Sequence, residues 1–118
     1  MKIIVLKFGG TSVGSIQRIK EVAKIIKSYS RKYKVIVLSS AMSGTTNKLI
    51  NMSLQISKNF PDHEYDTLVS TGEQISCSLL AGQLLENGVK ARSWMAWQIP
   101  ILTEGKHRHS RIKYINKN

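Results

Sequence analysis

Two short, mostly apolar segments, residues 2–7 and 35–38, are each followed by a loop rich in small residues and then by a helical pattern. Neither segment alternates apolar with polar positions, which is typical of parallel strands that are covered on both faces. After the first loop, Ser15 can cap a helix. Apolar side chains then recur at helical spacing, at Ile16, Ile19, Val22, Ala23 and Ile26. This pattern of two β-loop-α units predicts an α/β fold built on a parallel sheet.

The remaining pattern predicts two more helical regions and further strands. A helix is expected from about Thr46 to Ser57, ended by the proline of Phe60-Pro61-Asp62. A third helical region follows over residues 64–87, interrupted or sharply begun at residues 70–73, with Gly88 as the residue that ends it. Residues 90–95 are predicted to form a strand, and residues 101–103 are a candidate for another.

The end of the chain differs from the rest in composition. No carboxylate follows Glu104, whereas lysine, arginine and histidine are frequent after it. We therefore expect a domain over residues 1–105 and a frayed basic tail over residues 106–118. His107 and His109 lie two positions apart, which would place them on one side of a strand. Because no third ligand is near, the pattern favours a solvated tail over a metal site.

Composition limits the class of protein. The chain has 118 residues, of which 42% are hydrophobic and 21% charged, as expected for one small globular domain. No apolar stretch approaches the roughly 18 residues of a membrane span, and Ile3 to Leu6 is too short for a signal-peptide core, so a cytoplasmic location is expected. The single cysteine, Cys77, lies in a helical apolar pattern. A buried small hydrophobic role is favoured for it over a nucleophile or a metal ligand.

The net charge of +11 raises the question of nucleic-acid binding. The lysines, however, are scattered along the chain, and no aromatic residues are interleaved with them for base stacking. Abundant lysine, isoleucine and asparagine can also reflect an AT-rich coding sequence. Nucleic acid is therefore not favoured as a partner.

The loop after the first apolar segment has the residues of a phosphate site. In Lys7-Phe8-Gly9-Gly10-Thr11-Ser12-Val13-Gly14, two adjacent glycines let backbone N–H groups approach an anion, and Lys7 adds a positive charge. The spacing matches neither the P-loop nor the dinucleotide fingerprint. A tight turn that needs glycine for positive φ would explain the glycine pair alone. It would not explain an ammonium group and two hydroxyls at one point.

Two later segments are suited to a small charged substrate. The second loop has four hydroxyls, on Ser40, Ser43, Thr45 and Thr46, whereas capping the next helix needs only one. Four suit a small carboxylate or phosphate, although capping and turn formation remain the favoured interpretation of this loop in isolation. Ser70-Thr71-Gly72-Glu73-Gln74 places an acid at a helix start. That acid either complements the helix dipole behind a threonine cap or receives the ammonium group of an amino acid.

Three segments together resemble the aspartate kinases of the amino acid kinase superfamily. They are Lys7-Phe8-Gly9-Gly10-Thr11-Ser12-Val13, Ser40-Ala41-Met42-Ser43-Gly44-Thr45-Thr46-Asn47 and Ser70-Thr71-Gly72-Glu73-Gln74. The resemblance implies a three-layer αβα fold with a mainly parallel sheet, as in carbamate kinase. It covers roughly residues 1–112, which correspond to the amino-terminal, amino-acid-binding half of that catalytic domain.

The resemblance also implies an activity: transfer of the γ-phosphoryl group of ATP, with Mg²⁺, to the β-carboxylate of L-aspartate. This is the first step toward lysine, threonine and methionine. Lys7 would act in catalysis by neutralising charge on the transferring phosphoryl group. The nucleotide phosphates would also be held by the amides of Gly9 and Gly10 and by Ser12. The residues that would bind aspartate are Ser40, Thr46 and Glu73, with Glu73 facing the α-amino group.

Some family features are missing or altered. The segments that supply the nucleotide side in the family do not occur here, and Ala96 and Pro100 stand where glycines are usual. Glu104 stands in place of an aspartate. We therefore expect little activity from the chain alone, or a separately encoded carboxyl-terminal half as partner. The alternatives are a non-catalytic basic binding module and a degraded remnant without activity.

Overall fold

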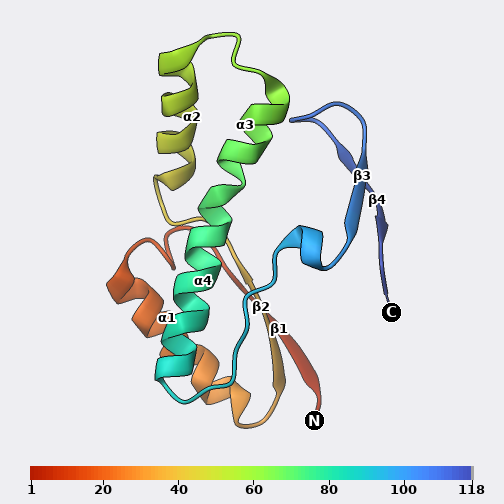
Figure 1. Ribbon diagram of the computed structural model, residues 1–118. Coiled ribbons are helices and arrows are strands. Elements are labelled where there is room, and N and C mark those ends of the chain that lie inside the picture. The colour runs from red at the N-terminus through yellow and green to blue at the C-terminus, as the bar shows by residue number, and fades with distance from the viewer. Residues whose placement is uncertain (118) are drawn as a thin grey trace.

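The computed structural model describes residues 1–117 and is shown in Figure 1. The first part of the chain forms β1 (Ile3–Phe8), α1 (Ile16–Ser30) and β2 (Lys34–Ser39). Three helices follow, α2 (Thr45–Ile56), α3 (Asp62–Val69) and α4 (Thr71–Glu86). The last part holds a short 3₁₀ helix, η1 (Ala96–Gln98), and the strands β3 (Ile101–Glu104) and β4 (Arg111–Ile115). The α/β class predicted from the sequence is confirmed.

The strands β1 and β2 pair in parallel, from Ile3 opposite Lys34 to Phe8 opposite Ser39. Helices α1 and α4 lie on one side of this pair (Figure 1). On that side, Leu6 and Val37 pack against the core. The other face is exposed among the described residues, and its apolar side chains are 50–65% accessible to solvent. The expectation that both faces of the sheet are covered therefore holds for one face only, because the helices that pack on this sheet lie on one side of it.

The core lies between α1, α4 and the sheet. Its buried apolar side chains come from the first loop and the two helices: Val13, Ile19, Val22, Ala23, Ile26, Leu80 and Leu84. Four of the five apolar positions predicted for α1 are in this core, whereas Ile16 is half-exposed at the start of the helix. Ser15 caps α1 as predicted, because its hydroxyl accepts a hydrogen bond of 3.2 Å from the backbone N–H of Arg18.

The predicted third helical region is divided at Ser70 into α3 and α4. Gly88 ends α4 in a left-handed conformation with φ of 78°, where its N–H and that of Val89 donate to carbonyls of the last turn. The strand predicted over residues 90–95 is wrong: these residues have no regular structure up to the start of η1. The sequence pattern of residues 90–95 is compatible with a strand. A strand, however, also needs a neighbouring strand to complete its backbone hydrogen bonds, and no described strand pairs with these residues.

The frayed tail expected after Gly105 is also wrong, because β4 pairs with β3 in an antiparallel hairpin. Ile112 and Tyr114 are good strand formers, and the hairpin supplies them with a partner. The division of the chain at residue 105 falls in the turn of this hairpin and stays a prediction. The candidate strand at residues 101–103 is confirmed as part of β3.

The turn of the hairpin is attached to α3 (Figure 1). The carboxylate of Asp66 accepts hydrogen bonds of 3.1 and 3.2 Å from the backbone N–H of Arg108 and lies 2.9 Å from Nδ1 of His107. The guanidinium of Arg108 lies 3.3 Å from Oδ1 of Asp62 and 3.8 Å from the ring centroid of Tyr65. This contact explains why the basic turn is ordered: its charges meet two carboxylates of α3.

Acid is expected to release this turn from α3. Desolvation alone would raise the pKa of Asp66, but the N–H of Arg108 and the imidazole of His107 outweigh it, so that this pKa lies below the ordinary 3.8. A depressed carboxyl pKa means that the contact is intact above the ordinary value and is lost as pH falls through the lower folded value.

The carboxyl ¹³C shift of Asp66, followed by NMR against pH, measures this pKa directly. His107→Ala should move the pKa up toward the ordinary value. Arg108→Gly keeps the backbone N–H and fits the positive φ of 67° at this position, so it should change the pKa less. A pKa of Asp66 at or above 3.8 in the unaltered chain would contradict the contact.

Candidate functional site

The loop after β1 and the loop after β2 pack against each other at Ala41. We call residues 9–14 the first loop and residues 40–44 the second loop. The N–H of Ser43 donates a 3.1 Å hydrogen bond to the carbonyl of Gly10. A Cβ atom on Gly10 would lie 2.9 Å from the carbonyl oxygen of Ala41, which is too close for any side chain. Gly10 therefore permits close packing of the two loops, and Ala41 is buried at their contact.

The start of α4 reaches the same residue. A Cβ atom on Gly72 would lie 3.1 Å from Cβ of Ala41 and 3.4 Å from Cγ2 of Thr45. One turn further along α4, the hydroxyl of Ser76 donates a 2.6 Å hydrogen bond to the carbonyl of Ser40, and Ser76 is fully buried. The segment that carries Glu73 is thus held against the second loop. The three segments singled out in the sequence meet at one end of the sheet.

The first loop has a compact backbone that leaves one of its glycines open. The N–H groups of Ser12 and Val13 both donate to the carbonyl of Gly9, at 3.1 and 3.3 Å. Val13 anchors the loop in the core. A Cβ atom on Gly9 would meet nothing within 4 Å, and neither Gly9 nor Gly10 has a positive φ. A turn that demands positive φ is therefore not the reason for this glycine pair: Gly10 is required by packing, and Gly9 leaves the backbone accessible.

The hydroxyls near the helix starts are not used as caps. The residue before α2 is Gly44, with φ of 82°, and no side chain caps that helix. No side chain caps α4 either, because the hydroxyls of Ser70 and Thr71 donate back to carbonyls of α3. The simpler interpretation, in which these hydroxyls serve as caps, is wrong for both helices.

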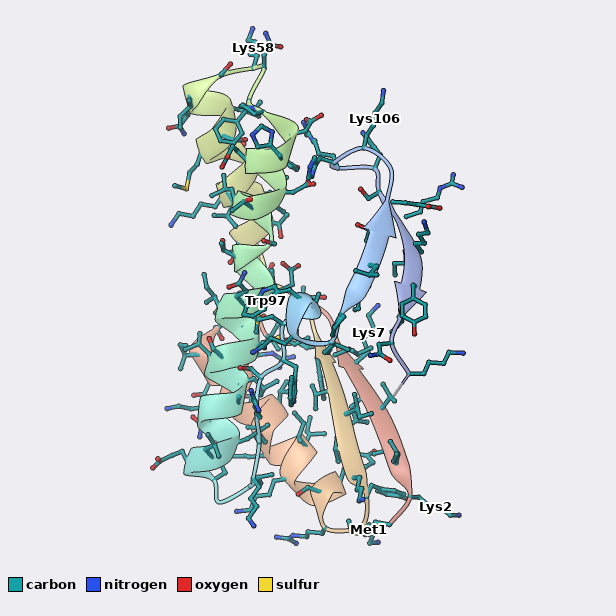
Figure 2. All side chains as sticks on the ribbon, turned by 45° about the vertical axis from the view of Figure 1, so that its right-hand side comes forward. Met1, Lys2, Lys7, Lys58, Trp97 and Lys106 are labelled. Atoms are coloured by element: carbon teal, nitrogen blue, oxygen red, sulfur yellow. The ribbon has the colours of Figure 1, made fainter. Side chains whose placement is uncertain are left out.

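Lys7 and Glu73 reach the junction at Ala41 from different elements, β1 and α4. Lys7 lies near the carboxyl end of β1 (Figure 2), on the exposed face of the sheet that also carries Ile3 and Val5. Glu73 is exposed in the first turn of α4. Within residues 1–117, no hydrogen bond or ion pair links the side chains of the predicted site residues to one another. The structure brings their loops together without a direct polar contact between these side chains.

The sequence did not assign a role at the site to Ala41 or Ser76, the two residues at which its segments pack together. The only signal for either was small size, since both pack where a larger side chain would separate the segments. Cys77 follows Ser76 and is half-buried. Its burial and the nearby Glu73 carboxylate raise its pKa, which supports the packing role expected for it over a nucleophile.

The described residues contain no group of three His, Cys, Asp or Glu side chains that could hold a metal ion. Nor is any helix within residues 1–117 long and apolar enough to cross a membrane. A groove of about 810 Å³ lies apart from the predicted site residues, along β2 and the segment after α4.

The comparisons with known proteins agree with the motifs. Residues 2–118 match the profile of the amino acid kinase family. The chain is 50% identical over 117 residues to the aspartokinase of Geobacillus stearothermophilus, covering 98% of this chain and 29% of that protein. It is 44% identical over 119 residues to the aspartokinase of Rickettsia felis, covering 98% of this chain and 30% of that protein. The chain thus spans about 30% of the length of these curated relatives.

Solved structures of aspartate kinases resemble the fold. The aspartate kinase from Synechocystis is 45% identical with a TM-score of 0.68, over 72% of this chain and 15% of that one. The E. coli aspartokinase III, solved in complex with aspartate and ADP, is 20% identical with a TM-score of 0.77, over 96% of this chain and 35% of that one. The family profile covers nearly the whole chain, and the chain therefore belongs to the amino acid kinase family.

Proposed function

We propose that this chain is the aspartate-binding and phosphoryl-cradling part of an aspartate kinase. The whole enzyme would transfer the γ-phosphoryl group of ATP to the β-carboxylate of L-aspartate, giving aspartyl phosphate, the first intermediate toward lysine, threonine and methionine. The observation that supports this most strongly is the junction at Ala41, where the first loop, the second loop and the start of α4 are held together. The sequence identity to aspartokinases supports the choice of aspartate as substrate.

On the phosphate side, Lys7 would neutralise charge on the transferring phosphoryl group. The open backbone at Gly9, with Gly10 and Ser12, would hold phosphate oxygens. Such transfer depends mainly on positioning and electrostatic stabilisation, which lysine and backbone amides supply. No general base is required, because the attacking carboxylate is already ionised at neutral pH.

On the aspartate side, Glu73 would pair with the α-ammonium group, while Ser40 and Thr46 would hydrogen-bond to the substrate. The uncapped starts of α2 and α4 favour the negative charge of a bound carboxylate. The E. coli relative was crystallised with aspartate and ADP, so a pocket for both exists on a similar fold.

ATP and Mg²⁺ would bind together. The donor set of residues 1–117 does not fit a protein-held metal ion, whereas Mg²⁺ is commonly held by substrate phosphates with one or two carboxylates. The remaining 70% or so of the relatives' length would supply the rest of the nucleotide site, from a further part of this protein or from a second polypeptide. We also propose a cytoplasmic location for the protein.

Aspartate binding tests the substrate half of this proposal. In titrations of the ¹⁵N-labelled chain with L-aspartate, amide shifts should change at the second loop and at the start of α4. Glu73→Gln should weaken binding by about tenfold, since a charge-assisted hydrogen bond is worth about 1.5–3 kcal/mol before solvent screening at an exposed site. Succinate lacks the ammonium group. Glu73→Gln should therefore weaken the binding of succinate much less than the binding of aspartate.

Glu86→Gln, at the other end of α4, is the matched control and should bind aspartate normally. If Glu73→Gln binds aspartate as tightly as the unaltered chain does, the assignment of Glu73 to the ammonium group is wrong. If succinate and aspartate bind equally in the unaltered chain, the site does not recognise an amino acid.

The catalytic half is tested by trapping the acyl phosphate. The purified chain with ATP, Mg²⁺ and L-aspartate, in the presence of hydroxylamine, should give little or no aspartyl hydroxamate. Turnover like that of a whole aspartokinase would show that the chain contains a complete nucleotide site. In that case Lys7→Met should reduce the turnover by orders of magnitude, with Lys2→Met as the control.

A further inference from the structure

The hydroxyl of Ser76 is bonded differently from those of the other serines in the described helices. A serine inside a helix commonly donates to a carbonyl one turn earlier in the same helix. The serines that do so here, each to the carbonyl three residues before it, are Ser28, Ser30, Ser53 and Ser78. Ser76 lies 3.1 Å from the corresponding carbonyl, that of Glu73, but only 2.6 Å from the carbonyl of Ser40 in the second loop. Its main bond therefore leaves the helix.

The bond from Ser76 fixes α4 to the second loop. Ser76 is fully buried, so the bond is shielded from water. The carbonyl of Ser40 also accepts a longer bond of 3.2 Å from Ser39, which is its neighbour in the chain and does not hold α4. Among the hydrogen bonds described for residues 1–117, the one from Ser76 is the link between α4 and the second loop. The place of α4 against this loop therefore depends on one hydroxyl and on the close contact at Gly72.

Two hydrogen bonds in series connect the parts of the proposed site. The first loop is joined to the second loop by the bond of 3.1 Å from the N–H of Ser43 to the carbonyl of Gly10. The second loop is joined to α4 by the bond from Ser76. Under the proposed function, aspartate has its ammonium group at Glu73 and its reacting carboxylate beside the phosphate site of the first loop. The two bonds together therefore set the length of the substrate that fits.

A site of fixed length can discriminate between amino acids that carry the same groups. L-Glutamate has the charged groups of L-aspartate and is longer by one methylene. In a site that does not yield, one methylene changes the relative affinity by about 10- to 200-fold. A site whose elements can separate loses this discrimination, because the longer amino acid can push them apart. Selection of the shorter amino acid therefore requires that α4 cannot move away from the second loop.

We propose that Ser76 is a positioning residue that makes the site select a four-carbon amino dicarboxylate over a five-carbon one, an inference that rests on the proposed function. Its buried hydroxyl does not touch the substrate. It holds the turn of α4 that carries Glu73 against Ser40, at the separation that aspartate spans. Serine suits this position because alanine would remove the bond to the Ser40 carbonyl, and a larger side chain would force α4 away at a fully buried point.

Binding of the two amino acids to the full chain, followed by NMR of the ¹⁵N-labelled protein, tests this role. The unaltered chain should bind L-aspartate more tightly than L-glutamate by about tenfold or more. Ser76→Ala should weaken the binding of aspartate by about fivefold, the usual effect of one lost hydrogen bond. The binding of glutamate should change little, because glutamate gains from the looser site what it loses in order. The preference for aspartate should thus fall by about the same factor of five.

Two other serine variants are matched controls. Ser53→Ala also removes a fully buried hydroxyl, but one that bonds within α2. Ser78→Ala makes the same change on α4, two residues from Ser76, where the hydroxyl bonds within the helix. Both variants should keep the preference of the unaltered chain, whatever their effect on the urea midpoint. The ¹³C shift of the Ser40 carbonyl reports the hydrogen bond itself and should change in Ser76→Ala alone.

An unchanged preference for aspartate in Ser76→Ala would overturn the inference and leave the proposed function standing. An equal loss of preference in Ser78→Ala would also overturn it, because the effect would then not come from the bond to Ser40. If the unaltered chain binds neither amino acid, the proposed function is wrong and the inference falls with it. The two failures are therefore distinguished by the binding of aspartate to the unaltered chain.

Discussion

Gly10→Val is expected to destabilise the chain by about 1–3 kcal/mol and to abolish aspartate binding. A Cβ atom at this position would lie 2.9 Å from the carbonyl oxygen of Ala41, a backbone atom that cannot turn away. The two loops would have to separate, and the hydrogen bond from Ser43 to the carbonyl of Gly10 would be lost with them. Urea unfolding followed by circular dichroism measures the stability, and the NMR titration with L-aspartate measures the binding.

Gly9→Val is the matched control, one residue away on the same loop. Nothing lies within 4 Å of a Cβ atom at Gly9, so the fold should tolerate the change. Under the proposed function this variant should keep aspartate binding but hinder the approach of a phosphate to the backbone. Equal urea midpoints for the two valine variants would show that the loops are not packed as the structure describes.

Ile19→Ala is expected to cost about 2–5 kcal/mol, the usual range for removing most of a fully buried aliphatic side chain. Ile19 is 2% exposed at the centre of the core, where the described residues contain only eight buried apolar side chains. A domain of this size has a total stability of about 5–15 kcal/mol, so the loss takes away a large fraction of it. The free energy of unfolding from urea titrations is the measurement.

Ile25→Ala tests the same substitution on the outer face of the same helix. Ile25 is 47% exposed, and its truncation should cost well below half of the loss at Ile19. Because both variants gain the same helix propensity from alanine, the difference between them reports burial. Similar losses at the two positions would place the core elsewhere than between α1, α4 and the sheet.

The local sequence pattern was sufficient to predict those elements that depend only on residues close to one another in the sequence. The β-loop-α units, the Ser15 cap and the buried stripe of α1 follow from apolar spacing and side-chain chemistry over a few residues. The end of α4 at Gly88 follows from the freedom of glycine to adopt positive φ. In contrast, residues 90–95 and residues 111–115 were misassigned, because strand formation depends on whether an edge is available, and periodicity does not contain that information.

The sequence by itself determined the chemistry of the candidate site: a lysine and two glycines after one strand, hydroxyls after the next, and a glutamate at a helix start. Only the tertiary structure decided which of these groups serve packing. Gly10 and Gly72 are small because Ala41 approaches them, whereas Gly9 and the hydroxyls near the uncapped helix starts have no such role. The physical reason is that close approach is a property of pairs of segments distant in sequence, and side-chain identity along one segment cannot specify what packs against it.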